Sequence, residues 1–495
     1  MINTADLSAF GKNDIRGIYG ENVTEELFYY VGKGFVRYIE SKTGVSPSDI
    51  WLTVARDARI HSEPLVKVLI KGIVHKGANV INLDIVPTPL GYYSEFATYP
   101  ENLCENVKIS GSLIVTASHN PPEYNGLKMT FDKASLSDEE IKLVKQYTQM
   151  EMASDISVVK HGESRLYNII PQYIDSIASN FPMVGKGIKV VTDSANGTAG
   201  VVAPQLYREI GCEVIDLYSE PDGRFPNHHP NPSDFSTLVD LQKKVIEEKA
   251  DIGIAFDGDS DRVGVVTSEG EILTGDKLLY IYAQDIIGDL APRGEKPVVV
   301  SEVKCSQVLY DEINKKGGYA VMAKTGHGYI KSKMKETGAI LAGEMSGHMF
   351  FKDRYYGFDD AVYSGCRIIE IVAKNKHKNP NFKLSDLLAP FSKVYSMNEI
   401  RHKCKNELKK SVLEKVTDKI KNDDCIFGTK IIDIVTIDGL RIIFPNGFAL
   451  IRQSNTEPVF TLRFEADKKE NAEHYSKVLV SLLDECINAV SESEG

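Results

Sequence analysis

The sequence predicts an α/β fold divided into three or four domains, and three observations support this prediction. Short apolar runs rich in β-branched residues alternate with stretches of helical periodicity through most of residues 1–390. A chain of 495 residues is also too long for a single hydrophobic core. Beyond residue 392 the alternation stops, and the pattern becomes that of a separate α+β domain.

Composition excludes several classes of protein. Hydrophobic residues make up 42% and charged residues 26% of the chain, the balance of a globular rather than a disordered or fibrous protein. The formal net charge of -11 argues against nucleic-acid or anionic-membrane partners. The N-terminus lacks a secretory signal, and no apolar run is long enough for a membrane span, so we expect a cytoplasmic protein. The seven cysteines are scattered without C-x-x-C pairing, so we expect them to be reduced and mostly structural.

Five apolar runs are typical of strands in a parallel sheet, and each leads into a polar or glycine-bearing turn. They cover residues 112–116 (SLIVT), 189–192 (KVVT), 252–256 (IGIAF), 298–301 (VVVS) and 339–342 (AILA). Three of the exits, in SLIVTASHN, IGIAFDGDSD and AILAGEMSGH, are dense in small polar and ionisable residues. Ligands of open α/β sheets collect outside the carboxyl ends of the strands, so we expect the functional site at these three loops.

The domain boundaries follow from helical and turn signals. A helical stretch at 167–180 follows the polar segment GESR, and the turn-rich segment TSEGEILTGDK follows the second strand exit. The tail contains a charged amphipathic helix within 403–424, hairpin strands within 431–444 and 448–454, and a final helix over 468–490. These signals predict domains at residues 1–165, 166–272, 273–392 and 393–495.

The first candidate loop is TASHNPPEYNGLK, residues 116–128. A serine that leaves a strand on a tight turn, followed by a Pro-Pro pair that restricts the backbone, is placed to project an exposed hydroxyl. Ser118 is therefore a candidate nucleophile beside His119, and Lys128 supplies a positive charge for an anion near the hydroxyl. The alternative, an Asx turn with a solvated serine, is the commoner fate of an isolated S-H-N-P tetrapeptide.

The second loop, FDGDSDR, predicts a metal site. Asp257, Asp259 and Asp261 alternate along the chain, so their carboxylates can converge on one hard cation such as Mg²⁺ or Ca²⁺. An EF-hand is excluded because its sixth position would be Arg262 and its twelfth Ser268. A solvated acidic turn is the alternative, but three carboxylates this close repel one another unless a cation joins them.

Three further loops are weaker signals individually. GEMSGH offers Glu344, Ser346 and His348 to sugar hydroxyls, although an ordinary turn with a capping serine fits as well. KTGHGYIK offers His327 as a proton carrier and Lys331 as a charge partner, although a lone histidine is more often structural. RQSNTEP fits either a phosphate cradle or a polar hairpin loop, and its candidate ligands are Arg452, Ser454, Asn455 and Thr456.

Taken together and in this order, the loops resemble those of the α-D-phosphohexomutase superfamily, which includes phosphoglucomutases, phosphomannomutases and phosphoglucosamine mutases. TASHNPPEYNG resembles the family's phosphoserine loop, DGDSDR its metal loop, GEMSGH its sugar-specificity loop and RQSNTEP its phosphate-binding loop. NDIRGIYG resembles the opening that places an arginine, here Arg16, beside the active-site phosphate. The chain departs from the family pattern at Asn13, Ala55 and His61, which are supporting positions.

The resemblance implies a fold and a mechanism. It implies three related α/β domains with mixed sheets and a C-terminal α+β domain around a central cleft. Phosphorylated Ser118 would donate its group to a sugar monophosphate and recover one from the resulting bisphosphate. One Mg²⁺ per chain, held by the three aspartates and Ser118 and supported by Arg16 and Lys128, would stabilise the charge in transit. His327 and His119 would be catalytic, and the implied substrate ligands are Arg262, Lys331, Glu344, Ser346, His348, Arg452, Ser454, Asn455 and Thr456.

Met345 in GEMSGH resembles the phosphomannomutase and dual phosphomannomutase/phosphoglucomutase branch. The resemblance therefore implies a cytoplasmic isomerase of carbohydrate metabolism, a phosphoprotein that interconverts hexose 1-phosphates and 6-phosphates with a hexose 1,6-bisphosphate as activator. The alternatives are a phosphoglucosamine mutase and a catalytically silent phosphosugar-binding homologue. The expected partner is a small phosphosugar, with neither nucleic acid nor membrane, and the expected state is a monomer or homodimer.

Overall fold

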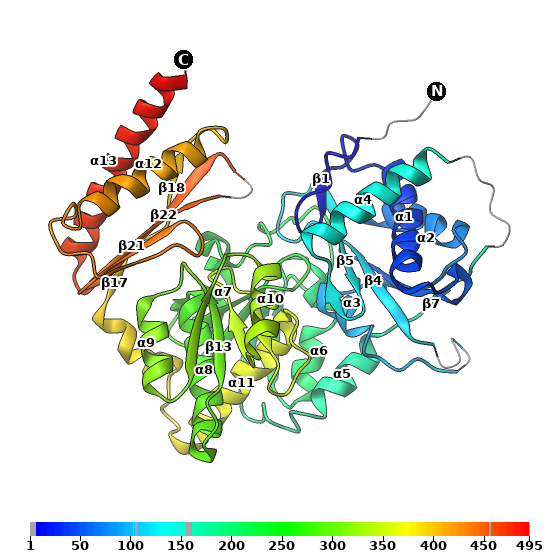
Figure 1. Cartoon of the computed structure of the whole chain (residues 1–495). Helices are drawn as coiled ribbons and strands as arrows, with labels where there is room; N and C mark the ends of the chain where they lie inside the picture. Colours follow the sequence, from blue (N-terminus) through cyan, green and yellow to red (C-terminus); the bar gives the residue numbers. More distant parts are fainter. Residues whose placement is uncertain (1–5, 102, 104–106, 155–160, 455–456, 495) are drawn as a thin grey trace. The chain divides into compact units, whose positions relative to one another are not determined.

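The computed structural model describes residues 6–101, 103, 107–154, 161–454 and 457–494 (Figure 1). These residues group into two compact units. The first unit comprises the described residues of Met1–Leu273 with Ser346–Phe351 and Phe358–Leu384. The second comprises those of Thr274–Met345, Lys352–Gly357 and Ser385–Gly495.

The described residues of the first unit contain a seven-stranded mixed sheet of order β1-β5-β4-β2-β3-β7, with β6 paired to β5. Strands β4, β2, β3 and β7 are parallel, whereas β5 is antiparallel to both β1 and β4. The strands are β1 (Ile15–Ile18), β2 (Trp51–Arg56), β3 (Asn79–Ile85), β4 (Ile109–Val115), β5 (Tyr124–Phe131), β6 (Ala134–Ser135) and β7 (Ser164–Leu166). The helices are α1 (Glu25–Thr43), α2 (Ser62–His75), α3 (Thr88–Tyr93), α4 (Asp138–Met152) and α5 (Ile170–Ala178).

Helix boundaries in this part follow from capping residues. Thr24 precedes α1 and accepts a hydrogen bond from the Leu27 amide, and α1 ends at Gly44 in the left-handed conformation. Ser137 and Glu140 form a reciprocal capping box at the start of α4. These caps satisfy amides that the first helical turn leaves without partners.

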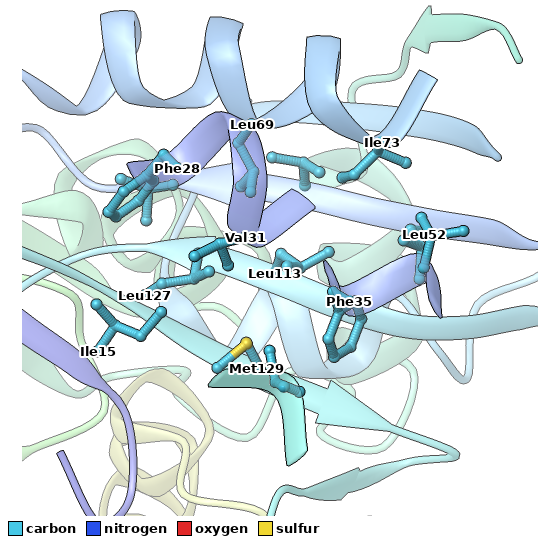
Figure 2. Close-up of a cluster of buried hydrophobic side chains, with 14 of the residues drawn as sticks. Ile15, Phe28, Val31, Phe35, Leu52, Leu69, Ile73, Leu113, Leu127 and Met129 are labelled. Carbon is cyan, nitrogen blue, oxygen red and sulfur yellow. The ribbon is translucent and has the colours of Figure 1, made fainter. Parts of the chain in front are cut away.

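The apolar faces of α1 and α2 cover one face of the seven-stranded sheet. Figure 2 shows buried side chains of α1 and α2 gathered against side chains of the strands. The labelled residues are Phe28, Val31 and Phe35 of α1, Leu69 and Ile73 of α2, and Ile15, Leu52, Leu113, Leu127 and Met129 of the strands. Burial of each large side chain stabilises the fold by about 1.5–3 kcal/mol, so this core holds β4 and β5 firmly at the edge where the Ser118 loop begins.

A second sheet in the described part of this unit has five strands in the order β12-β11-β10-β8-β9. Strands β10, β8 and β9 are parallel, and β11 and β12 continue the sheet in antiparallel pairs. The strands are β8 (Lys189–Asp193), β9 (Glu213–Leu217), β10 (Ile252–Phe256), β11 (Val263–Thr267) and β12 (Ile272–Leu273). The unit also contains α6 (Ala203–Glu209), α7 (Val239–Glu247), β16 (Met349–Phe351) and α11 (Ala361–Lys378).

The second unit contains a parallel set of strands in the order β14-β13-β15 and a separate antiparallel sheet. The first comprises β13 (Val298–Glu302), β14 (Tyr319–Ala323) and β15 (Leu341–Gly343), with helices α8 (Gly275–Leu290), α9 (Gln307–Lys315) and α10 (His327–Thr337). The second has the order β17-β22-β21-β20-β19, with β18 paired to β22. Its elements are β17 (Tyr395–Ser396), β18 (Ile400–Lys403), α12 (Lys409–Asn422), β19 (Asp433–Val435), β20 (Leu440–Phe444), β21 (Gly447–Gln453), β22 (Val459–Ala466) and α13 (Lys469–Glu494).

The predicted fold class is confirmed: three successive α/β segments with a mixed-sheet pattern precede a C-terminal α+β segment. All five predicted strands are present, although β15 begins two residues after the predicted start. The helix predicted within 403–424 is present but shorter: Lys403 still belongs to strand β18, and α12 begins at Lys409 and ends at Asn422. The domain boundaries at 165, 272 and 392 remain predictions.

The six described cysteines are all free, and five of them are buried; Cys104 lies outside the described residues. In the described part of the chain, none of the helices combines the length and the apolar character that a bilayer crossing needs.

Candidate active site

The Ser118 loop leaves β4 in a strained conformation. Ser118 has a φ of 52°, in the left-handed region, and its amide donates to Thr116 Oγ1 at 2.9 Å. Contrary to the expectation of an exposed hydroxyl, Ser118 is only 3% exposed. Its Oγ instead donates to Asp257 Oδ2 at 2.6 Å. The hydroxyl is therefore directed at the acidic loop and not at bulk water.

The three aspartates follow β10 and converge as predicted. All three are buried, and they each offer a carboxylate oxygen within 4.8 Å of the others. The amides of Asp261 and Arg262 both donate to Asp257 Oδ1 at 3.1 Å, which closes the loop on itself. Gly258 lies so close to the Ser118 loop that a Cβ there would approach Ser118 O to 2.5 Å. Two strand exits more than 100 residues apart thus form one site, since the Ser118–Asp257 pair spans 139 residues.

One lysine offsets part of the acidic charge. Lys128 Nζ donates to Asp259 Oδ2 at 2.7 Å and to Asp261 Oδ2 at 2.5 Å. Burial lowers the pKa of Lys128, but these two carboxylates outweigh it and hold that pKa well above its usual value. Burial, with Asp261 and Asp259 nearby, holds the pKa of Asp257 well above its usual range. The triplet therefore carries more negative charge than Lys128 neutralises.

The residues of this loop fit a hard divalent cation. Asp259 Oδ1 is buried and has no hydrogen-bond partner among the described residues, whereas Oδ2 accepts from Thr88, Thr116 and Lys128. An all-oxygen carboxylate set suits Mg²⁺ better than softer metals. The triplet is a candidate acidic metal site on both grounds.

One histidine lies beside the hydroxyl, and Arg262 links it to a second histidine. His119 Nδ1 lies 3.2 Å from Ser118 Oγ, and Arg262 donates to His348 Nε2 at 3.3 Å and lies 3.4 Å from His119 Nε2. Burial, with Arg262 and Arg16 nearby, holds the pKa of His119 well below its usual value, so its imidazole is neutral at pH 7. Because the Ser118 hydroxyl donates to Asp257, the neutral imidazole can donate its Nδ1 proton to Ser118 Oγ in the matching tautomer.

His348 ties the end of the GEMSGH segment to the acidic loop. Its Nε2 lies 3.3 Å from Asp261 Oδ1, and Ser346 Oγ lies 2.9 Å from its Nδ1. Gly347 has a φ of +92°, and a Cβ there would lie 2.5 Å from Val263 O, so only glycine fits this close approach. Burial raises the pKa of Asp261, but Lys128, His348 and Arg262 outweigh it and hold that pKa well below its usual range.

Arg16 lies against the same loop. Its Nη1 donates to Asn120 Oδ1 at 2.8 Å and to Ala117 O at 3.2 Å, and its Nη2 donates to Asp14 at 2.5 Å. The structure thus brings Ser118, His119, Arg16, Lys128, the three aspartates, Arg262, Ser346 and His348 into one neighbourhood of the first unit.

The remaining predicted residues belong to the second unit. His327 begins α10, with Lys331 one turn later, and Glu344 Oε1 accepts from the Gly326 amide at 2.7 Å. Arg452 lies one residue before the end of β21 and donates from Nε to Asp438 Oδ2 at 3.0 Å, and the Ser454 carbonyl accepts from Lys409 Nζ at 3.0 Å. Asn455 and Thr456 lie outside the described residues. The meeting of these residues with the Ser118 site remains a prediction.

Sequence reasoning missed the support beneath Ser118. Arg59 Nη2 donates to Ser118 O at 3.0 Å and to Asn120 O at 2.6 Å, and its Nε donates to Asp57 Oδ2 at 3.0 Å. Asp57 in turn accepts from the Ala117 amide at 3.3 Å. The available signal was the strand exit VARDAR, whose charged pair follows β2 beside β4 in the sheet.

A buried serine hydroxyl hydrogen-bonded to a candidate acidic metal site at the carboxyl ends of α/β strands is the arrangement typical of metal-assisted phosphoryl-transfer enzymes. Phosphoglucomutase/phosphomannomutase family models match most of the chain in order: α/β/α domain I over residues 7–154, domain II over 171–270, domain III over 274–394 and the C-terminal domain over 399–481. The chain belongs to this family, the α-D-phosphohexomutase superfamily, whose members are isomerases.

Individual relatives agree with the family. The phosphomannomutase/phosphoglucomutase of Pseudomonas aeruginosa is 39% identical over 481 residues, which cover 97% of this chain and 96% of the relative. The phosphoglucomutase of Neisseria gonorrhoeae is 37% identical, with 92% of this chain and 93% of the relative covered. The crystal structure of a phosphoglucomutase/phosphomannomutase family protein from Burkholderia thailandensis superposes with a TM-score of 0.86 at 34% identity, covering 98% of each chain.

Proposed function

We propose that the chain interconverts hexose 1-phosphates and hexose 6-phosphates of mannose and glucose through a phosphorylated Ser118. The observation that carries the proposal is the 2.6 Å hydrogen bond between Ser118 Oγ and Asp257 within the acidic triplet. A nucleophile in contact with a metal-binding carboxylate is the arrangement that phosphoryl transfer needs, because transfer depends on charge stabilisation more than on covalent assistance.

Each half-reaction exchanges one P–O bond. In the first, the bond between phosphorus and Ser118 Oγ breaks, and a bond forms to the free hydroxyl of the hexose monophosphate. The hydroxyl proton passes to a base on the protein, for which His327 is the candidate. The bisphosphate then turns over, and the reverse exchange returns a phosphoryl group to Ser118 and releases the isomeric monophosphate.

Charge on the moving group is stabilised by the residues around Ser118. Asp257, Asp259, Asp261 and the Ser118 oxygen would hold one Mg²⁺ per chain, which withdraws charge from the phosphoryl oxygens. Arg16 and Lys128 bring fixed positive charge to the same loop. His119, neutral and 3.2 Å from Ser118 Oγ, lies within hydrogen-bond distance of the serine oxygen and adds no positive charge there.

The substrate's other phosphate requires a second anion site. Arg452, Ser454, Asn455 and Thr456 supply a guanidinium, two hydroxyls and an amide, the donor set that a phosphate dianion prefers. Glu344 and Ser346 are the candidates for the sugar hydroxyls, with Arg262, Lys331 and His348 as further ligands. A site separate from the reacting phosphate lets either end of the hexose bisphosphate occupy it.

A panel of mannose, glucose and glucosamine 1-phosphates, each assayed for its 6-phosphate with and without a hexose 1,6-bisphosphate activator, tests the proposal. Turnover of mannose and glucose phosphates supports it. Preference for glucosamine phosphate would favour the alternative, a phosphoglucosamine mutase; a relative from Methanopyrus kandleri that is 30% identical to this chain is named a probable phosphoglucosamine mutase. Binding without turnover of any of the three would indicate a catalytically silent homologue.

We further propose a cytoplasmic enzyme that is a monomer or homodimer.

A further inference from the structure

Two carboxylates outside the predicted set link three loops of the second unit. Asp438 Oδ2 accepts from Arg452 Nε at 3.0 Å and from the Thr325 amide at 3.1 Å. Glu302 accepts from Thr325 Oγ1 at 2.6 Å and from the Met345 amide at 2.8 Å. Thr325 precedes α10, Met345 lies in GEMSGH, and Arg452 lies in the phosphate loop. The two carboxylates therefore connect three segments that are far apart in the sequence.

The position of Asp438 is tightly constrained. It lies between β19 and β20, immediately before Gly439, which has a φ of +80°. A Cβ on Gly439 would lie 2.2 Å from Ile451 O and 2.7 Å from Arg452 Cα, so the Asp438 backbone is held directly against the strand that carries Arg452. The hydrogen bond from the Thr325 amide then restrains the Asp438 carboxylate at the same oxygen that accepts from Arg452.

The guanidinium of Arg452 is bonded through one of its three nitrogens. The side chain is 7% exposed, and within the described residues its Nε is the only side-chain nitrogen that donates a hydrogen bond. A guanidinium has five N–H donors in a rigid plane, so fixing Nε leaves the four donors of Nη1 and Nη2 as an end-on fork. This fork is the geometry that binds two oxygens of a phosphate group.

We propose that Asp438 is a positioning residue, which holds the Arg452 guanidinium in the orientation that receives the non-reacting phosphate of the substrate. The inference rests on the proposed function, because it takes Arg452 as a phosphate ligand. Without Asp438, the long Arg452 side chain regains rotamer freedom that phosphate binding must remove, so the affinity for the sugar phosphate falls. Asp438 itself acts through Arg452 and need not touch the substrate.

A double-mutant cycle on KM tests the proposal. Asp438→Ala should raise KM for glucose 1-phosphate about tenfold or more, the ratio that corresponds to about 1.4 kcal/mol, with kcat changed much less. In an Arg452→Ala background, the same substitution should raise KM no further, because the group that Asp438 positions is absent. Asp438→Asn keeps an acceptor oxygen without the charge and should give a smaller increase.

Asp433→Asn is the matched control, because Asp433 is exposed on the preceding strand and, within the described residues, its side chain accepts one hydrogen bond, from the neighbouring Ile434 amide. It should leave KM unchanged. Additive effects in the cycle, or an unchanged KM in Asp438→Ala, would overturn the proposal. If Asp438→Ala does not fold, the cycle is run with Asp438→Asn, and the same two outcomes decide.

A binding experiment distinguishes failure of the proposed mutase function from failure of the positioning role of Asp438. Calorimetric titration of glucose 6-phosphate into the Ser118→Ala protein measures affinity without turnover. If wild-type protein turns over none of the panel but Asp438→Ala weakens this binding only when Arg452 is present, the positioning role stands and the mutase function fails. If glucose 6-phosphate binding is insensitive to Arg452→Ala, the positioning role is overturned whatever the turnover.

Discussion

Replacing Arg59 by lysine should destabilise the loop that carries Ser118. Arg59 is 1% exposed and uses all five N–H donors: Nε on Asp57 at 3.0 Å, and Nη1 and Nη2 on carbonyls at 2.5, 3.1, 3.0 and 2.6 Å. Those four carbonyls belong to Pro121, Tyr124, Ser118 and Asn120.

The magnitude follows from the donor count. An ammonium has three donors, so in Arg59→Lys at least two of the five acceptors lose their partner. Each buried acceptor left without a partner costs about 1–3 kcal/mol, which sums to about 2–6 kcal/mol for the pair. Because all four carbonyls lie in one segment, part of the cost should appear as mobility of Ser118 and as a lower kcat for phosphoryl transfer.

Urea denaturation followed by tryptophan fluorescence measures this loss. The chain's single tryptophan, Trp51, begins β2, the strand that leads to Arg59, and therefore reports on this unit. The control is Arg37→Lys, the same substitution at an arginine that is 38% exposed and lies 3.3 Å from Glu151, for which less than about 1 kcal/mol is expected. Equal unfolding free energies for the two variants would refute the reasoning.

Three other substitutions have defined outcomes. Asp259→Asn keeps an oxygen that can accept from the donors now on Oδ2, so the thermal unfolding midpoint should stay within a few degrees of wild type. Mg²⁺-dependent turnover should be lost, and substantial turnover would contradict the metal assignment. Arg452→Ala should raise KM for hexose 1-phosphates more than it lowers kcat in steady-state assays, and the reverse pattern would argue against a phosphate ligand. Burial raises the pKa of Glu95 from 4.5 to about 7, so between these pH values the folded state binds more protons than the unfolded state and stability falls as pH rises. Glu95→Gln should therefore stabilise the protein at pH 8, by at most about 3 kcal/mol, and not at pH 4; an equal effect in urea denaturation at both pH values would exclude this origin.

Patterns within short stretches of sequence were enough to predict the fold class and the strand exits at Ser118 and Asp257. The strand exits at Ser118 and Asp257 were identified because an apolar run followed by small polar residues is visible within a dozen positions. Their convergence followed from a general rule for α/β sheets, and the structure joins them at 2.6 Å. The fold class was predictable for the same reason, since alternation of strand and helix periodicity is a local signal.

The residues that were missed depend on partners distant in the sequence. Arg59 bonds a carbonyl 59 positions away, and Asp438 bonds an amide 113 positions away, so neither role can be seen in a window of the sequence. The start of α12 was misplaced by six residues, because Lys403 pairs with Val459 of β22 and the helix begins only at Lys409. The buried state of the Ser118 hydroxyl likewise depends on the packing of the acidic loop over it.

Intact-mass spectrometry after incubation with a hexose 1,6-bisphosphate tests most directly whether Ser118 carries the phosphoryl group. Wild-type protein should gain the mass of one phosphoryl group, which peptide mapping should assign to Ser118, and Ser118→Ala should gain none. A phosphoryl group on another residue, or an active enzyme that is never phosphorylated, would contradict this expectation.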